Sequence, residues 1–287
     1  MNNYNLLSHR SQEPENGVLY LVGSPIGNLS DISSRAINIL KNVNLIACED
    51  TRQTRKIMNS LEISNKLISF NQHNSPEKIP SLIKYLKSGN SIALVSDAGM
   101  PGICDPGEDL VKNIISSGSE AICIPGPCAA LTALISSGFP SSKFIFEGFL
   151  PKKNIDREKL LHEISQNEKT TILFEAPHRL EKLLKDLKSY CGGERIIHIS
   201  RELTKRFEEN INTDINNAIK IFEERKAIGE FTVIIKGKSK LKDIQFDKIS
   251  LRKDLHELVN AGLSLSSAAK YLAKKRNIPK NTVYKLY

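Results

Sequence analysis

The most restrictive feature of the sequence is a repeated order of apolar run, glycine- and proline-rich turn and helical pattern through its first half. Three of these turns directly follow apolar runs: Gly23–Gly27 after Val18–Val22, Ser96–Gly107 after Ser91–Val95, and Pro125–Pro127 after Ala121–Ile124. Helical patterns cover 33–40, 53–60, 75–87, 108–116 and 128–136, and a further strand is expected over 43–48. Strands that alternate with helices form parallel sheets covered on both faces. Because the carboxyl ends of parallel strands meet at one edge, the turns are expected to enclose a ligand crevice there.

The same patterns divide the chain into a tail, two α/β domains and a helical end piece. Residues 1–16 are polar and predict a flexible tail, and residues 17–140 predict an N-terminal domain with a mostly parallel sheet. Residues 141–238 contain shorter, alternating strands, which indicate a second α/β domain with a mixed sheet. After a linker, residues 245–287 form a basic, helix-turn-helix-like appendage with helical patterns over 251–260, 265–275 and 282–286.

Positive charge is concentrated at the C-terminal end of the chain. The 287 residues carry a formal net charge of +9, and from Lys240 onward eleven Lys and Arg stand against four Asp and Glu. A concentrated basic module indicates a nucleic-acid partner, and a merely solvated lysine-rich face is the alternative. No apolar run is long enough for a membrane helix, and the five cysteines form no CxxC pair and no metal-ligand spacing. A cytoplasmic protein without a metal is therefore expected.

The three turns lack the motifs of several common enzyme classes. Gly23–Gly27 does not follow G-x-G-x-x-G, and the chain contains neither GxxxxGK[ST] nor G-x-S-x-G. A nucleotide-hydrolysing enzyme is therefore disfavoured. Glycines let backbone groups approach a flat purine and its ribose closely, while prolines stiffen the turns around them. This composition suits an adenosyl ligand with little phosphate.

Short motifs along the chain occur in the order typical of one methyltransferase class. They are Val22–Leu29, Cys48–Arg52, Ser96–Gly107 and Pro125–Pro127, followed by Gly148–Lys152, Ala176–Arg179 and Arg201–Lys205. With them the chain resembles the tetrapyrrole-methylase-type class of S-adenosylmethionine methyltransferases over residues 17–236. Within that class it is most similar to members that act on small-subunit ribosomal RNA. It departs from the usual pattern, through a lost or changed hydroxyl, at Ser24, Met100, Cys104, Cys128 and Ala176.

The resemblance implies a two-domain tetrapyrrole-methylase-like α/β fold with an added helical appendage, assembled as a homodimer. It also implies an activity: transfer of a methyl group from S-adenosylmethionine, without a metal, to the ribose 2′-hydroxyl of a cytidine in 16S ribosomal RNA of the small ribosomal subunit. The residues that it places at the cofactor are Pro25, Gly27, Asp97, Ala98, Gly99, Ile103, Pro125, Gly126, Cys128, Ala129 and Ala176.

Three ionisable residues are candidates for helping to remove the ribose proton, because a ribose hydroxyl is a very weak acid. They are Glu49, Asp50 and His178. The alternative for Glu49 and Asp50 is a helix start, with an N-cap and first-turn acids paired to a nearby arginine. The alternative for His178 is a structural hydrogen bond or a contact with an RNA phosphate. Asp105 is expected only to stabilise its turn.

Basic residues near the turns are expected to form a track for RNA phosphates, with solvated surface charges as the alternative. They are Arg52, Arg55, Lys152, Lys153, Arg179, Arg201 and Lys205. Unpaired or splayed RNA is the expected target, since the enzyme must reach one sugar.

Two other functions stay open. A methylase of a tetrapyrrole (corrin or sirohaem) precursor would share the fold but would leave the basic appendage unexplained. A non-catalytic RNA-binding or ribosome-assembly factor would have no affinity for S-adenosylmethionine.

Overall fold

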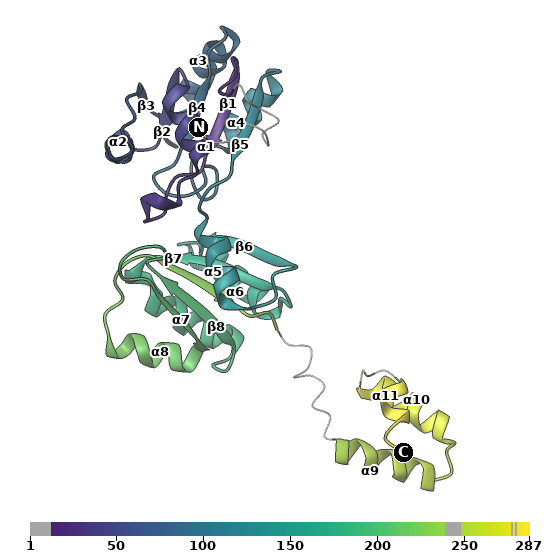
Figure 1. Ribbon diagram of the computed structural model, residues 1–287. Helices are drawn as coiled ribbons and strands as arrows, with labels where there is room; N and C mark the ends of the chain where they lie inside the picture. The colour runs from purple at the N-terminus through teal and green to yellow at the C-terminus, as the bar shows by residue number, and fades with distance from the viewer. Residues whose placement is uncertain (1–12, 239–247, 277, 279) are drawn as a thin grey trace, which may run out of the picture. The chain divides into compact units, whose positions relative to one another are not determined.

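The computed structural model describes residues 13–238, 248–276, 278 and 280–287, and it divides into two compact units (Figure 1). The first unit is residues 1–165 with 169–236, and the second is residues 166–168 with 237–287. Most of the expected tail and all of residues 239–247, within the expected linker, lie outside the described residues. The two units are therefore considered separately.

Five parallel strands form the first sheet, in the order β3–β2–β4–β1–β5 (Figure 1). The strands are β1 (Val18–Val22), β2 (Leu45–Cys48), β3 (Leu67–Ser69), β4 (Ile92–Val95) and β5 (Glu120–Ile124). The helices around them are α1 (Ser34–Asn42), α2 (Thr51–Ser60), α3 (Ser75–Lys87) and α4 (Glu108–Ser116). Successive residues face opposite sides, so Tyr20 packs with α1 and α2, and Leu19 packs with α3 and α4. The predicted parallel sheet with two covered faces is confirmed.

The edge strand β3 and the bounds of α1 differ from the sequence expectation. β3 has three residues, all half-buried, and a run that short does not stand out from a loop. Ser33 caps α1 by accepting a hydrogen bond from the amide of Ala36 at 3.1 Å, and the helix then continues to Asn42. The next strand consequently begins at Leu45 rather than at residue 43.

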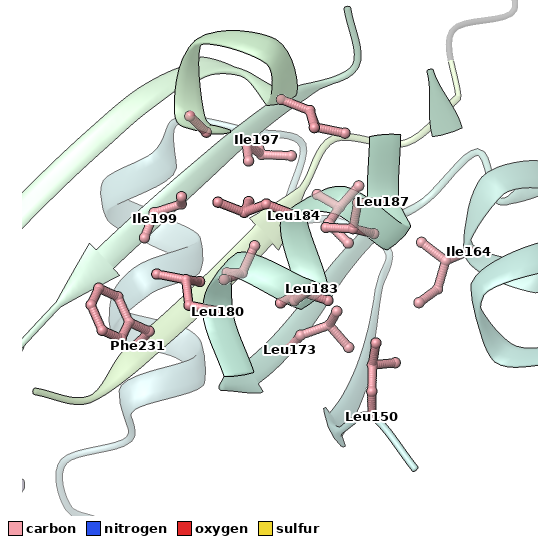
Figure 2. Close-up of a cluster of buried hydrophobic side chains, with 14 of the residues drawn as sticks. Leu150, Ile164, Leu173, Leu180, Leu183, Leu184, Leu187, Ile197, Ile199 and Phe231 are labelled. Atoms are coloured by element: carbon pink, nitrogen blue, oxygen red, sulfur yellow. The ribbon is translucent and has the colours of Figure 1, made fainter. Parts of the chain in front are cut away.

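The second sheet has the order β6–β7–β10–β8–β9. β6 and β7 pair in parallel, and the other pairings are antiparallel, so the predicted mixed sheet is confirmed. The strands are β6 (Phe144–Phe149), β7 (Thr170–Glu175), β8 (Ile196–Arg201), β9 (Glu209–Asp214) and β10 (Phe231–Ile235), and the helices are α6 (Asn154–Gln166), α7 (Pro177–Cys191) and α8 (Ile215–Glu224). Figure 2 shows leucines of α7, among them Leu180 and Leu184, packed against Ile197 and Ile199 of β8.

Helix α5 (Ala129–Ser137) packs against the second sheet, although it directly follows the last strand of the first. Its buried alanines and Leu134 share a cluster with Ile172 of β7 and Ile234 of β10. The expected N-terminal domain, residues 17–140, included this helix, so the structure corrects its assignment. The helix is apolar around most of its circumference, and periodicity therefore does not indicate which sheet it covers.

The second unit contains three helices, α9 (Lys248–Asn260), α10 (Leu265–Arg276) and α11 (Lys280–Tyr284). They have a hydrophobic core of their own, which includes Leu255, Leu272 and Val283. The three predicted helices are confirmed, with the third beginning at Lys280. In the part of the chain that the structure describes, no helix is both long and apolar enough to cross a membrane.

The three turns at the edge of the first sheet contact one another through their backbones. The amide of Gly23 donates to the carbonyl of Ile124 at 3.2 Å, and Ser24 and Gly99 exchange two backbone hydrogen bonds, at 2.8 and 3.2 Å. A Cβ atom on Gly23 would lie 2.7 Å from the Cα of Gly126, closer than real side chains approach. The turns therefore meet at one edge, as the sequence predicts, and glycine is required where they touch.

Gly23→Ala tests this packing. The added methyl group must push the turns apart, which we expect to lower the free energy of unfolding by about 1–3 kcal/mol, the usual range for overpacking. The backbone hydrogen bonds between Ser24 and Gly99 join the same turns, so they should open more often, and hydrogen exchange at these two amides should become faster. Denaturant unfolding and hydrogen–deuterium exchange measure the two effects.

Gly118→Ala is the matched control. A Cβ atom on Gly118 meets nothing within 4 Å, so an alanine there is strained only by the backbone φ of +84°. The Gly118→Ala variant should have a free energy of unfolding lower by about 1–2 kcal/mol because of backbone strain, and hydrogen exchange at Ser24 and Gly99 should be unchanged. The same exchange rates in both variants would contradict the proposed contact.

Candidate functional site

A cavity of about 360 Å³ lies in the first unit, bounded by the turns of the first sheet and by strand ends of the second. The turn after β4, the start of α5 and the residues after β7 all contribute to its wall. Six of the predicted cofactor residues line it: Ala98, Gly99, Ile103, Cys128, Ala129 and Ala176. The structure thus brings together residues that lie far apart in the sequence.

Several residues of the cavity wall were not among the predicted cofactor contacts. They include Ile26, Met100, Cys104, Asp105, Phe149 and Phe174. The rings of Phe149 and Phe174 meet edge to face with their centroids 5.8 Å apart, and Phe149 remains 50% exposed. For the two phenylalanines the sequence signal was the position of Phe149 within the motif Gly148–Lys152, because strand-end phenylalanines otherwise resemble core residues.

Five predicted cofactor residues do not line the cavity: Pro25, Gly27, Asp97, Pro125 and Gly126. Two of them shape the turns instead. Gly126 lies against Gly23, and a Cβ atom on Gly27 would collide with the side chain of Lys205. The first turn therefore packs closely on the segment after β8, and this contact joins the two sheets beside the cavity.

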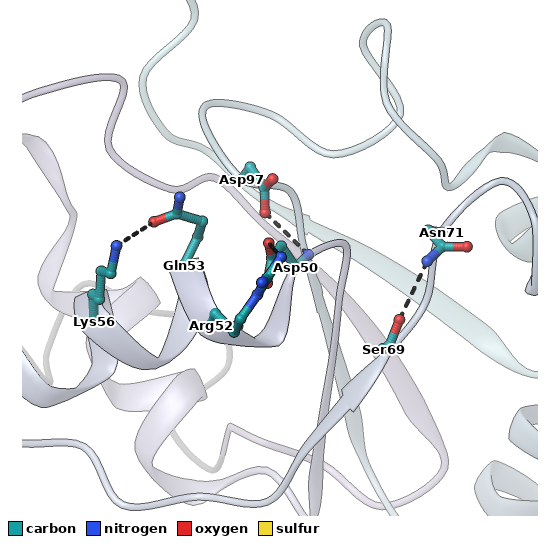
Figure 3. Close-up of polar contacts among 7 residues, drawn as sticks. All are labelled: Asp50, Arg52, Gln53, Lys56, Ser69, Asn71 and Asp97. Carbon is teal, nitrogen blue, oxygen red and sulfur yellow. Dashed lines mark hydrogen bonds and ion pairs between the residues drawn. The ribbon is translucent and has the colours of Figure 1, made fainter.

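Asp50 occupies the N-cap position of α2, the role given above as its alternative. Its carboxylate accepts the amide of Arg52 at 2.8 Å and pairs with the Arg52 guanidinium at 3.0 Å (Figure 3). The backbone amide of Asp50 donates to the exposed carboxylate of Asp97 at 3.1 Å. The hydrogen bond from Arg52 holds the pKa of Asp50 below its usual value. A carboxylate stabilised in its charged form is a weak proton acceptor, so this geometry disfavours the predicted catalytic role of Asp50.

Asp105 has the most perturbed carboxylate of the site, and it lines the cavity. Burial raises the pKa of Asp105 to about 6, the nearby Glu49 carboxylate adds to the shift, and a hydrogen bond with Ser96 opposes it. Burial, followed by repulsion from Asp97 and Asp50, also raises the pKa of Glu49. These carboxylates destabilise one another's charges, and a bound cation would relieve that repulsion. The sequence did not reveal this role because aspartates are also common in ordinary turns.

Glu175 and Arg179 form a buried ion pair at the wall formed by the second sheet. The Glu175 side chain is fully buried, lies 3.2 Å from the Arg179 guanidinium, and accepts the amide of Ala176 at 2.9 Å. Arg179 also donates to the carbonyl of Leu150 at 2.7 Å. Its two partners favour a structural role over the predicted RNA contact. His178, on the first turn of α7, is exposed and does not line the cavity.

The other predicted RNA-binding residues differ in their exposure, and several of them, including Arg52 with its partner Asp50, are held by neighbouring groups. Lys205 pairs with Glu202 at 3.0 Å and with Glu230 at 2.9 Å, and Arg201 donates to the carbonyl of Ile228 at 2.7 Å. The remaining four are exposed, and they are Arg52, Arg55, Lys152 and Lys153. Lysines at the turn before α6 are therefore better placed for phosphates than Lys205.

The chemistry of the wall limits what the cavity can hold. Its surface is mostly apolar, and the residues that line it include Phe149, Phe174 and the carboxylate of Asp105. Flat apolar walls suit a purine ring, and carboxylates suit a positive charge, so an adenosyl ligand that carries a cationic group fits this arrangement. Among the described residues, no group of three His, Cys, Asp or Glu side chains is arranged to hold a metal ion.

Comparisons with known proteins agree with this geometry. The chain matches the family model described as Tetrapyrrole (Corrin/Porphyrin) Methylases over residues 18–219. A solved structure of diphthine synthase superposes with a TM-score of 0.58 at 14% identity, over 76% of this chain and 90% of that one. At this identity the likeness concerns the fold alone.

Sequence relatives are closer. A protein from Synechocystis sp. named Ribosomal RNA small subunit methyltransferase I is 43% identical over 270 residues, which cover 94% of this chain and 97% of the relative. One of the same name from Thermotoga maritima is 44% identical over 222 residues, which cover 77% of this chain and 99% of the relative. The chain therefore belongs to the tetrapyrrole methylase family and, within it, to the ribosomal RNA small subunit methyltransferase I family.

Proposed function

We propose that this protein transfers a methyl group from S-adenosylmethionine to the ribose 2′-hydroxyl of a cytidine in 16S ribosomal RNA of the small ribosomal subunit, in the cytoplasm. The observation that carries the proposal is the apolar, carboxylate-bearing cavity at the carboxyl ends of the parallel strands. Relatives that are about 40% identical and named for this RNA support the substrate class.

The cofactor proposal rests on the fit between wall and ligand. S-adenosylmethionine carries a purine, an ammonium group and a sulfonium whose methyl group is the one transferred. Ile26, Phe149 and Phe174 offer apolar surface for the purine, and Asp105 and Glu49 offer negative charge for the cationic part. The backbone of the turn at Ala98 and Gly99 is available for hydrogen bonds with the ligand.

The chain's own part in the reaction would be to hold the two reactants in line and to exclude water. Positioning of this kind supplies much of the rate of a group transfer. The ribose proton still needs an acceptor, and we assign this role to Glu49 among the predicted candidates. Its pKa is raised by burial and by neighbouring carboxylates, so it accepts a proton more readily than Asp50.

The homodimer is part of the same proposal. It is supported by the apolar residues that α5 leaves uncovered in the single chain, Leu131 at 45% and Ile135 at 76% exposure. A tetrapyrrole methylase remains the second candidate because it shares the fold, but the names of the relatives and the basic appendage favour RNA.

Methyl transfer to isolated small subunits tests the function directly. Subunits from a strain that lacks the gene should accept labelled methyl from S-adenosylmethionine, and digestion of the RNA should place the label in a 2′-O-methylcytidine. Subunits from the parent strain, which already carry the methyl group, should accept almost none. Label in a base, or no label in the RNA of the deficient subunits, would contradict the proposal.

Asp105→Asn should change donor affinity and folding stability in opposite directions. In the folded protein the pKa of Asp105 is about 6, well above the usual 3.8. Ionisation of Asp105 therefore destabilises the folded state, and the effect grows as the pH rises from about 4 to about 6. Removal of the charge should therefore raise the free energy of unfolding at pH 7.5 by about 1–3 kcal/mol and change it little below pH 4. Affinity for S-adenosylmethionine should fall at pH 7.5.

The affinity for S-adenosylmethionine should also depend on pH, following the ionisation of Asp105. In the unchanged protein the affinity should decrease from pH 7 to pH 5 as Asp105 becomes protonated, and Asp105→Asn should flatten that profile. Calorimetry and thermal unfolding measure both effects. Asp109→Asn, an exposed aspartate on α4, is the control and should leave donor affinity unchanged. A variant that loses stability at pH 7.5 would show that the Asp105 charge is not strained.

A further inference from the structure

The appendage presents two faces of opposite character on helix α10. Ala268, Ala269 and Leu272 are buried in the core of the three-helix unit. The opposite face carries Lys270 and Lys274 one turn apart and Tyr271 and Lys275 one turn apart, all exposed. We refer to the side chains of Lys270, Tyr271, Lys274 and Lys275 as the α10 face. Among the described residues of the unit, Tyr271 is not part of the hydrophobic core.

The charge of this part of the chain is strongly one-sided. From Ala261 to Tyr287 the sequence has six Lys and Arg residues and no Asp or Glu. Among the three helices of the unit, only α9 carries acidic residues, and its Asp254 pairs with Arg276 at 2.8 Å. Within the described residues no acidic side chain forms an ion pair with the lysines of the α10 face. Their positive charge is therefore available to an anionic partner.

Two tyrosines of the unit are exposed to solvent, and one of them lies on the α10 face. Tyr271 is 52% exposed, and the Nζ of Lys275 lies 5.8 Å from its ring centroid. Tyr284 on α11 is 48% exposed. Tyr287, in contrast, stacks on His256 of α9 with the ring centroids 4.8 Å apart. Tyr271 and Tyr284 therefore have ring surface available, and Tyr271 has cations beside it.

We infer that the α10 face binds unpaired RNA, with a base stacked on Tyr271 and phosphates held by the lysines around it. An exposed ring next to a row of cations matches the pattern by which single strands are bound, since every base offers a flat face and every link offers a phosphate. Bases in a duplex are already stacked and cannot cover the ring. The inference deepens the proposed function and rests on it for the identity of the RNA as ribosomal.

The comparison of lengths supports a separate task for the appendage. The Thermotoga maritima relative matches over 222 residues that make up 99% of its own length. That length is enough for the two sheets, from Val18 to Ile235, but not for the two sheets together with α9–α11. The methylase fold of that relative is therefore complete without such a unit, and in this chain the unit is free to add contacts with the substrate.

The test is binding of a short fluorescent single-stranded RNA to the full-length protein, without S-adenosylmethionine, measured by anisotropy over a range of salt concentrations. Tyr271→Ala should weaken binding about 5- to 150-fold, the range for loss of one stacked base, and should leave the slope of affinity against salt unchanged. Tyr271→Phe should restore the affinity because it restores the ring. The double variant Lys270→Ala, Lys274→Ala should reduce the salt slope by about 1.4, which is about 0.7 for each lost phosphate contact with a single strand.

Two controls make the result specific to the α10 face. Tyr190→Ala removes a tyrosine of α7 that is 36% exposed, and it should leave RNA binding unchanged. The same RNA annealed into a duplex should bind more weakly than the single strand and should not respond to Tyr271→Ala. Unchanged affinity in Tyr271→Ala, no rescue by Tyr271→Phe, or duplex binding as tight as single-strand binding would overturn the inference.

Failure of this inference and failure of the proposed function can be distinguished. If the protein methylates small subunits but Tyr271→Ala binds RNA normally, the proposed role of the α10 face is wrong and the proposed enzymatic function stands. If RNA binding depends on Tyr271 but the protein transfers no methyl group, the proposed role of the α10 face is supported and the proposed enzymatic function is wrong.

Discussion

The contact between the turns of the first sheet is the constraint on which the rest of the site depends. Gly23 and Gly126 approach so closely that neither position has room for a side chain, and the Ser24–Gly99 pair fastens the turn after β1 to the turn after β4. The parallel sheet places the carboxyl ends of its strands side by side, and the glycines convert that proximity into backbone contact. The wall at Ala98 and Gly99 is held in place by it.

The second sheet completes the cavity through α5 and through a buried charge. Because α5 leaves the first sheet and packs on the second, its first residues, Cys128 and Ala129, form part of the wall where the sheets meet. Glu175 is buried at the same place, which is costly for a carboxylate unless it is paired. Arg179 and the amide of Ala176 supply partners for it. These contacts fix the end of β7 against the ligand space.

Charge is used differently in the two units. In the first unit many of the charged side chains near the cavity are held by opposite charges or by carbonyl groups, as Arg52, Lys205 and Arg179 are. Carboxylates remain beside the cavity, where they repel one another. Among the three helices of the second unit, only α9 carries acidic residues, and the lysines of α10 face solvent. This separation matches a cationic donor in one place and an anionic polymer in another.

Apart from the short edge strand β3, the sequence by itself determined the order of strands and helices, the parallel and mixed sheets, the meeting of the glycine-rich turns and the basic three-helix appendage. These follow from periodicity, from turn composition and from net charge, which are local properties. Only the tertiary structure decided that α5 covers the second sheet, that Asp50 is a helix cap and that Asp105, rather than Asp97, faces the cavity. A turn aspartate has the same local sequence whether it points to solvent or to a ligand. The difference arises from burial and from charges contributed by other strands, because Glu49 reaches Asp105 only when β2 and β4 lie side by side.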